Sequence, residues 1–177
     1  MPINIKHFVE LNMHFLKKFN LPENVRFNSF EFALNEALKR KSKVLVETGV
    51  ARGKQKLFFF SRINWKDGMS TLIFSEYADY VNGHLYACDI NEKNIKNAKN
   101  FTKKIDFLFL DSLDGQHPNT AEHQLEEIKS AIQKLHKNSL VLLDDNGLKT
   151  ELSIKYMLNN GFKIINETKQ QVLLCFK

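Results

Sequence analysis

The spacing of apolar and polar positions changes near Lys43. Before that point apolar residues recur every three or four positions, which is typical of amphipathic helices. Beyond it, short apolar runs alternate with longer amphipathic stretches, a pattern that predicts strands separated by helices. The runs that are apolar on both faces, as parallel strands covered by helices on either side are, lie at 44–46, 84–88, 105–110 and 140–143. The helices between and after them are expected at 70–80, 92–100, 120–136 and 149–159.

Two further strands are expected at 162–165 and 172–176, after the signal Asn160-Gly161, which commonly ends a helix. Their connector is too short for a crossover helix, so we expect these two strands to pair antiparallel. The sequence therefore predicts an α/β fold: a Rossmann-like three-layer sandwich whose mostly parallel sheet ends in an antiparallel strand pair.

The first 41 residues predict two helices in front of this core. The first has one apolar stripe over 5–19. The second begins at Asn28, which can cap a first turn that carries Glu31 three residues later. It ends in the basic cluster around Arg40, where cations suit the negative end of the helix dipole.

Composition narrows the class of protein. A chain of 177 residues with 43% hydrophobic and 26% charged residues fits one globular domain, with a helical cap at 1–41 and a Rossmann-like core at 42–177. No apolar run approaches the roughly 20 residues that a membrane-spanning helix needs, and the chain does not open with a secretory signal pattern. We therefore expect a cytoplasmic protein with no membrane partner, in which Cys88 and Cys175 are buried free thiols; a disulfide between them is the alternative.

The net charge of +6 changes this picture little. A charge excess of this size can favour anionic partners, including RNA or a phosphorylated substrate. No zinc-finger or RNP-type motif accompanies it, so a small-molecule substrate is the expected partner and nucleic acid is not.

Each of the four core strands is followed by an acidic residue. These acids are Glu47, Asp89, Asp111, and Asp144 with Asp145. Because ligands bind at the carboxyl ends of strands in an open parallel sheet, we expect the acids to converge on one cleft. Capping of the next helix explains one or two of them, and explains four poorly. Carboxylates buried together need hydroxyls, amides or a cation beside them.

The segment 47–53 directly after the first strand has the composition of a ligand loop. Gly49 lets the backbone approach a ligand closely, and Gly53 allows a sharp turn. Ser70 stands at the start of the next helix, whose free N–H groups favour a carboxylate or a polar ligand edge. Asp89 is placed to accept hydrogen bonds from a ribose diol, so the cleft predicts a nucleoside-containing ligand.

In this order the elements resemble the class I S-adenosylmethionine (AdoMet)-dependent methyltransferases. The matching segments are Glu47-Thr48-Gly49, Asp67-Gly68-Met69-Ser70-Thr71, His84-Leu85-Tyr86-Ala87-Cys88-Asp89 and Phe109-Leu110-Asp111-Ser112. The antiparallel final strand pair also matches that family, and argues against a nicotinamide-binding fold, whose sheet is all parallel. The resemblance implies an AdoMet-dependent enzyme with these cofactor-binding residues: Glu47, Thr48, Gly49, Gly53, Ser70, Asp89 and Asp111.

One group within that family is closer. Asp111 together with the later segment Asp144-Asp145-Asn146 is similar to the metal-binding pattern of the catechol O-methyltransferase-like and related sugar-modifying enzymes. The resemblance implies Mg²⁺ or Mn²⁺ held by Asp111, Asp145 and Asn146, with Asp144 as a close substitute. Hard oxygen ligands suit these ions, which would lower the pKa of an acceptor hydroxyl. The alternative is that the same segment is a turn that caps the next helix.

Two histidines follow Asp111, and either could be a general base. His123 fits an ordinary helix-surface position, so His117, together with Asp111, is the predicted catalytic residue. The aromatic segment Leu57-Phe58-Phe59-Phe60 with Trp65 is unusual between a strand and its helix. It predicts a pocket lining, a dimer contact or an extra buried strand.

The chain is short after its second core strand. Only one helix fits between Asp89 and Ile105, where the family pattern has a helix, a strand and another helix. The loss removes a loop that normally contacts adenine and leaves strand two at the edge, which favours a homodimer or cover by the N-terminal helices.

These features lead to a prediction and its alternatives. The prediction is an AdoMet-dependent, metal-assisted O-methyltransferase for a small sugar or catechol-like substrate. The first alternative is a non-catalytic methyltransferase-like module that binds a nucleotide, RNA or a protein. A metal-dependent hydrolase or hydroxylase at the same acidic edge is the second alternative.

Overall fold

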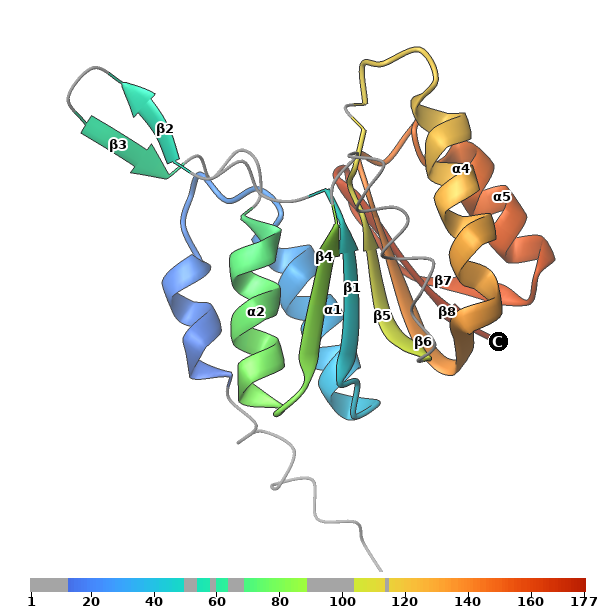
Figure 1. The fold of residues 1–177 in the computed structure, drawn as a ribbon, viewed down its shortest axis with the longest axis horizontal. Helices are drawn as coiled ribbons and strands as arrows, with labels where there is room; N and C mark the ends of the chain where they lie inside the picture. Colours follow the sequence, from blue (N-terminus) through green and yellow to red (C-terminus); the bar gives the residue numbers. More distant parts are fainter. Residues whose placement is uncertain (1–12, 50–53, 58–59, 64–68, 89–103, 114) are drawn as a thin grey trace, which may run out of the picture.

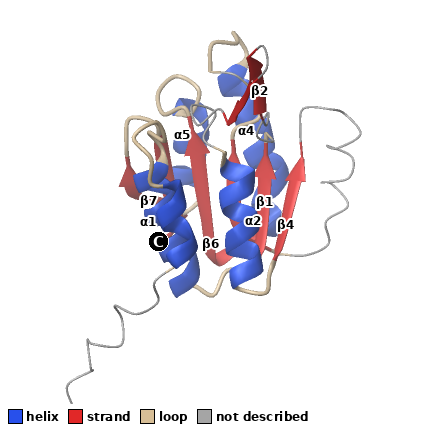
Figure 2. Ribbon diagram, turned by 90° about the vertical axis from the view of Figure 1, so that its left-hand side faces the viewer, coloured by secondary structure: helices blue, strands red, loops and turns tan. Residues whose placement is uncertain are grey.

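The computed structural model describes residues 13–49, 54–57, 60–63, 69–88, 104–113 and 115–177. Its main sheet has the strand order β4-β1-β5-β6-β8-β7 (Figures 1 and 2). The strands of this sheet are β1 (Val44–Thr48), β4 (His84–Cys88), β5 (Ile105–Leu110), β6 (Leu135–Asp144), β7 (Phe162–Glu167) and β8 (Gln171–Phe176). The described helices are η2 (His14–Phe19), α1 (Phe27–Lys39), α2 (Ser70–Tyr80), α4 (Thr120–Ala131), η4 (Ile132–Lys134) and α5 (Glu151–Asn159).

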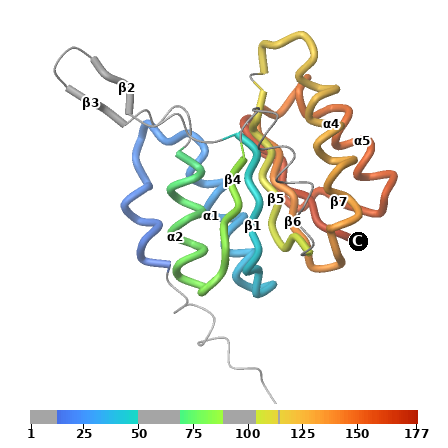
Figure 3. The backbone as a smooth tube through the Cα atoms, viewed as in Figure 1, coloured from blue at the N-terminus to red at the C-terminus, as the bar shows by residue number. Residues whose placement is uncertain are grey.

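The sheet is covered by helices on both faces, as the sequence predicts. In Figures 1 and 3, η2, α1 and α2 lie on one face, and α4 and α5 lie on the other. From Phe107 onward strand β5 is apolar on both faces: Phe107 and Phe109 pack under α1 and α2, whereas Leu108 and Leu110 pack under α4 and α5. All four of these side chains are buried. The predicted three-layer α/β sandwich is confirmed.

The predicted parallel and antiparallel pairings are also confirmed. Strand β1 pairs in parallel with β4 and β5, and β5 pairs in parallel with β6. Strand β8 is antiparallel to both β6 and β7. Because β1 lies at the centre of the parallel part, the residues that follow it face both neighbouring strand ends.

A phenylalanine cluster fixes α1 and α2 on the sheet. The ring of Phe74 in α2 lies 5.3 and 5.2 Å from the rings of Phe107 and Phe109, with steeply inclined planes. Phe30 in α1 meets Phe74 edge-on at 5.4 Å. Inclined aromatic pairs of this kind add about 1 kcal/mol each beyond their buried area. The cluster therefore holds the start of α2 at a fixed place over β1.

The predicted start of the second helix at Asn28 is wrong. Helix α1 begins at Phe27, its N-cap position is Arg26, and no side chain caps it. The reason is the turn in front of it: the Phe27 N–H already donates to the carbonyl of Asn24 at 3.0 Å. Of the first predicted helix only 14–19 is described, and it is a 3₁₀ helix.

The helix predicted over 120–136 also ends early. Helix α4 stops at Ala131, the short helix η4 follows, and β6 begins at Leu135. Leu135 pairs with Ile105 of β5, and Ser139 Oγ donates to the Ile105 carbonyl at 2.6 Å. Strand pairing therefore takes these residues out of the helix. The C-terminal signal Asn160-Gly161 is confirmed, since Gly161 has a φ of 84° directly after α5.

The aromatic insertion contains two short strands, β2 (Lys54–Leu57) and β3 (Phe60–Ile63), which pair antiparallel in a sheet of their own. The insertion therefore forms strands, as one of the three interpretations expects, but they pair in a hairpin of their own and not with the main sheet. The helix predicted over 92–100 lies outside the described residues. Among the helices that the structure does describe, none is both long and apolar enough to span a bilayer.

Candidate active site at the carboxyl edge of the sheet

Backbone hydrogen bonds join the ends of three neighbouring strands. The Gly49 N–H donates to the Cys88 carbonyl at 2.8 Å, and the Asp111 N–H donates to the Thr48 carbonyl at 2.9 Å. The carboxyl ends of β4, β1 and β5 therefore lie side by side. This is the arrangement that the acidic strand ends predict, except that Asp89 itself lies outside the described residues.

Glycine is required at position 49 by the backbone conformation there and by the nearby Asp111 carbonyl. Its φ is 83°, and a Cβ atom there would lie 2.2 Å from the Asp111 carbonyl oxygen. L-residues with a side chain rarely adopt such a φ, and no side chain fits at that distance. The prediction gave Gly49 a close approach to a ligand. In the structure its close approach is to the loop that follows β5.

Glu47 is a buried carboxylate at the end of β1. It is 0% exposed, and Oε1 accepts a hydrogen bond from the Ser70 hydroxyl. Burial raises the pKa of Glu47 from 4.5 to about 7, and the hydroxyls of Ser70 and Thr71 offset part of the rise. The second oxygen, Oε2, is buried with no hydrogen bond of standard geometry from the described part of the chain. Such a group is suited to receive a donor from a ligand.

Ser70 opens α2 beside Glu47. The residue before it, Met69, has a φ of 48°, and no side chain caps the helix within the described residues. The first N–H groups of a helix carry a partial positive charge, which favours an anionic group near them. Glu47 and the start of α2 thus place an acceptor and a set of donors next to each other. Thr48, between Glu47 and Gly49, has a buried hydroxyl without a partner among the described residues.

Asp144 at the end of β6 is fully buried and strongly held. Arg26 Nε lies 2.8 and 3.0 Å from its two oxygens, and Gln171 Nε2 donates to Oδ1 at 2.7 Å. Gln171 accepts in turn from the Ser29 hydroxyl of α1. Burial alone would lower the pKa of Arg26, but the carboxylates around it, Asp144 first, raise it. The ion pair fastens the start of α1 to the sheet.

Asp111 and Asp145 share one cation. Lys149 Nζ donates to Oδ1 of Asp111 at 3.0 Å and to Oδ2 of Asp145 at 3.1 Å. Burial and the neighbouring Asp144 carboxylate raise the pKa of Asp111, and Lys149 offsets only part of this. Burial acts to lower the pKa of Lys149, whereas Asp111 and Asp145 raise it above its ordinary value. Asp145 itself has a φ of 56°.

The predicted metal ligands are brought together only in part. Carboxylate oxygens of Asp111, Asp144 and Asp145 all lie within 4.8 Å of one another. Asn146, the third predicted ligand, uses its amide elsewhere: Nδ2 donates to the Thr168 carbonyl at 2.7 Å, and Oδ1 accepts from the Thr150 hydroxyl at 3.3 Å. The substitute, Asp144, takes the third place, and the Asn146 turn also leads into α5 as the alternative interpretation expects.

The donor set is all oxygen, which suits Mg²⁺ or Mn²⁺ in kind. It does not fit such an ion as the side chains stand, because Arg26 and Lys149 already bind the oxygens that the ion would need. A divalent ion would have to displace a lysine side chain that is only 2% exposed.

The two histidines after Asp111 lie in different surroundings. His117 is exposed, and its Nδ1 accepts only from the backbone N–H of Asn119 in the same turn. His123 Nε2 lies 2.9 Å from Oγ of Ser112, the residue next to Asp111, and 3.6 Å from a Glu127 oxygen. The neighbouring Glu127 carboxylate raises the pKa of His123. The geometry therefore brings His123, and not the predicted His117, to the acidic edge.

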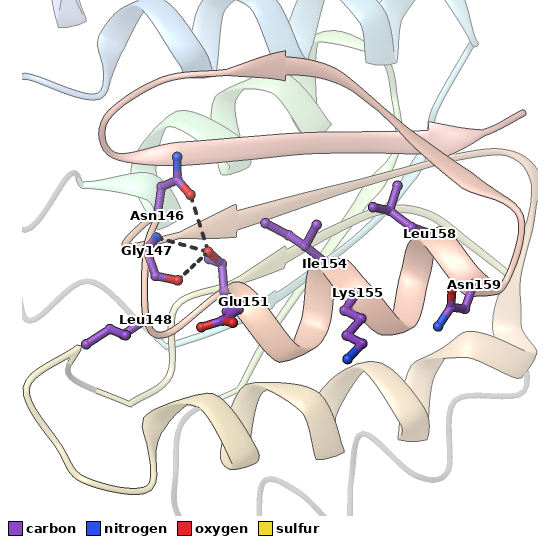
Figure 4. Close-up of a pocket in the computed structure, with 9 residues that line it drawn as sticks. Asn146, Gly147, Leu148, Glu151, Ile154, Lys155, Leu158 and Asn159 are labelled. Atoms are coloured by element: carbon purple, nitrogen blue, oxygen red, sulfur yellow. Dashed lines mark hydrogen bonds between the residues drawn. The ribbon is translucent and has the colours of Figure 1, made fainter.

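A groove of about 710 Å³ runs along α5 next to this edge (Figure 4). Its lining includes Asn146 and the apolar side chains of Leu148, Ile154 and Leu158. None of the three clustered acids lines it, so this groove is separate from the carboxyl cluster. Leu148 is 83% exposed and stands at its mouth.

Three residues that bind the acids of this edge were not predicted. Arg26 and Gln171 come from segments far from the acids in the sequence, and no motif marks them. Lys149 had a usable signal, because it stands four residues after Asp145. Such spacing places two side chains on the same side of a helical turn. The predicted residue Gly53 lies outside the described part of the chain.

Comparisons with known proteins bear on the arrangement as a whole. No protein-family model matches the sequence, and a search of curated proteins gives no match. Solved structures do match. The O-methyltransferase TomG from Streptomyces achromogenes, in complex with SAM (another abbreviation of AdoMet), is 11% identical, with a TM-score of 0.53 over 99% of this chain and 100% of that one.

Two further structures agree. An O-methyltransferase from Bacillus cereus in complex with SAH (S-adenosylhomocysteine) is 11% identical, with a TM-score of 0.50 over 100% of this chain and 93% of that one. The fold is that of the AdoMet-dependent methyltransferases. The MycE methyltransferase of mycinamycin biosynthesis, with Mg and SAH, gives a TM-score of 0.59 at 10% identity over 92% of this chain and 53% of that one. Identities this low establish the methyltransferase fold alone.

Proposed function

We propose that this protein is an AdoMet-dependent O-methyltransferase that acts on a small hydroxylated substrate, such as a sugar or a catechol-like diol. The methyltransferase fold supports the class of cofactor. The observation that carries the proposal is the buried Glu47 carboxylate near the carboxyl end of β1, bound by Ser70 at the start of α2. An acidic group and a helix N-terminus side by side match a ligand with both an ammonium and a carboxylate, as AdoMet has.

The cofactor would lie across the ends of β1 and β4. Glu47 Oε2 would accept from the ammonium group, because it is buried and lacks a donor of standard geometry among the described residues. The carboxylate would meet the first N–H groups of α2. Asp89, which lies outside the described residues, is predicted from the sequence to hold the ribose. The loop that begins at Gly49 would pass beside the cofactor.

The acceptor would approach from the ends of β5 and β6. In the transfer, the hydroxyl oxygen of the substrate forms a bond to the methyl carbon while the sulfonium–carbon bond breaks. The products are a methyl ether, SAH and one proton. Asp111 would accept the proton, because burial and the adjacent Asp144 raise its pKa and so make its carboxylate form a stronger base. His123 lies one residue away, through Ser112.

The sequence also predicts that a divalent metal ion assists the transfer. Mg is present with SAH in the MycE structure, which supports it by analogy of fold. In this protein Arg26 and Lys149 already bind the carboxylates of Asp111, Asp144 and Asp145, which argues against a bound metal ion. No step of the proposed transfer is therefore assigned to a metal ion. The protein's own cations would supply the positive charge at this edge.

A transfer assay tests the proposal. The protein is incubated with AdoMet that carries a labelled methyl group and with a panel of sugars, catechols and other small alcohols. We expect label in at least one hydroxylated acceptor, with stoichiometric SAH, and a rate at least about tenfold lower for Ser70→Ala, which loses a hydroxyl that orients Glu47. A chain that binds SAH but labels no acceptor would contradict the enzyme and favour the non-catalytic module.

A further inference from the structure

The acidic cluster at the carboxyl edge already contains two protein cations. Lys149 bridges Asp111 and Asp145 at 3.0 and 3.1 Å with a side chain that is 2% exposed. Arg26 binds both oxygens of Asp144 and, at 3.2 Å, Oδ1 of Asp145. These five charged groups come from the residue after β5, the end of β6, the turn before α5 and the turn before α1. They form one connected network, the carboxyl-edge network.

Few carboxylate oxygens of this network are left free to bind a metal ion. Three carboxylates have six oxygens, and five of them accept a hydrogen bond from Arg26, Lys149 or Gln171. Mg²⁺ requires a near-octahedral shell of oxygens at short distance. The backbone also closes in, since a Cβ at Gly115 would lie 3.2 Å from Oδ2 of Asp145. An ion could bind only by removing the present donors.

Charge leads to the same result. With all groups ionised, three carboxylates and two cations leave one negative charge. An added divalent ion would sit beside the buried ammonium of Lys149. At a separation of about 4 Å and an effective dielectric of about 20, the two would repel by about 8 kcal/mol. The lysine side chain itself is only 2% exposed.

We infer that the Lys149 ammonium takes the place of a divalent metal ion in the carboxyl-edge network. It ties the end of β5 to the end of β6, and it positions Asp111 at the cleft without any bound metal. The inference goes beyond the proposed function and does not depend on it, because metal binding is measured without cofactor or substrate.

The test measures the binding of Mn²⁺ alone, at neutral pH, by electron paramagnetic resonance and by calorimetry. The wild-type protein and Lys155→Met, which removes an exposed lysine of α5, are expected to show no saturable binding below about millimolar Mn²⁺. Lys149→Met removes the buried cation and frees an oxygen of Asp111 and one of Asp145. It is expected to bind Mn²⁺ at least about tenfold more tightly than the wild type.

Two controls keep the result decisive. Adding Asp145→Asn to Lys149→Met should abolish the gained Mn²⁺ site, and Lys149→Arg, which keeps the cation, should gain none. If Lys149→Met does not fold, the wild-type protein still decides: its thermal midpoint should be the same in chelator and in Mg²⁺. Saturable micromolar Mn²⁺ binding to the wild type that Asp145→Asn abolishes would overturn the inference, as would an Mg²⁺-dependent rise in midpoint. SAH binding, measured on the same samples, separates this outcome from failure of the proposed function.

Discussion

Replacing Glu47 with glutamine tests how the buried carboxylate shapes both stability and binding. The side chain is 0% exposed at the end of β1, and its pKa rises from 4.5 to about 7 on folding. A raised carboxyl pKa means that the folded state binds the proton more tightly than the unfolded state. The contribution of Glu47 to stability is therefore greatest below pH 4.5, falls between pH 4.5 and about pH 7, and stays reduced above that range.

The size of this effect follows from the pKa difference. Taking 1.36 kcal/mol per pKa unit, a rise from 4.5 to about 7 corresponds to about 3 kcal/mol of stability lost across the window. For a domain of this size, that is a change of about 6–12 °C in thermal midpoint. Glu47→Gln keeps an oxygen that can accept from Ser70 and removes the titration. Its new amide N–H₂ costs about 1–3 kcal/mol if left unpaired, but at every pH alike.

The assay is denaturant unfolding at several pH values from 4 to 8, for the wild type, Glu47→Gln and the control Glu31→Gln at an exposed position of α1. We expect the stability difference between Glu47→Gln and the wild type to shift by about 3 kcal/mol in favour of the variant as pH rises from 4 to 8. The control should follow the wild type throughout. Parallel curves for Glu47→Gln and the wild type would refute the reasoning, since Glu47 would then titrate alike in both states.

Three further changes test other parts of the site. Asp144→Ala removes the fully buried carboxylate that binds Arg26 and Gln171, and should cost about 3–5 kcal/mol in urea unfolding, whereas Asp79→Ala on the exposed side of α2 should cost under about 1. Gly49→Ala should cost at least about 2 kcal/mol by the same assay, because its φ is 83° and the new Cβ would meet backbone at 2.2 Å; an unchanged midpoint would contradict the geometry. His123→Gln should lower the transfer rate by at least about tenfold, with His117→Gln near the wild type; the reverse order would favour the original catalytic prediction.

Much of the fold was predictable because its strands are apolar on both faces. The bounds of β4, β5 and α2 agree with the sequence prediction residue for residue. Burial on both sides applies to β5, whereas β4 is only partly buried at the edge of the sheet. The carboxyl edge follows from the same pattern, since parallel strands place their ends together. Glu47, Asp111 and Asp145 were found in this way.

The partners of the acids were less predictable. Arg26 and Asp144 are 118 residues apart, so their contact depends on how α1 packs over the sheet. The residues around Arg26 and Asp144 in the sequence do not predict that packing. Asn146 shows the opposite error: a motif suggested a metal ligand, whereas its amide satisfies the turn that leads into α5. The helix start at Asn28 failed for a similar reason, because a preceding backbone turn began the helix earlier.

The central claim is that the ends of β1 and β4 bind AdoMet, and SAH binding to the wild-type protein tests it most directly. Isothermal calorimetry is run with SAH in chelator and again with Mg²⁺. We predict saturable one-to-one binding of SAH with the same affinity in both buffers. Absence of binding at millimolar SAH would contradict the cofactor assignment, and binding that requires Mg²⁺ would contradict the metal-free site.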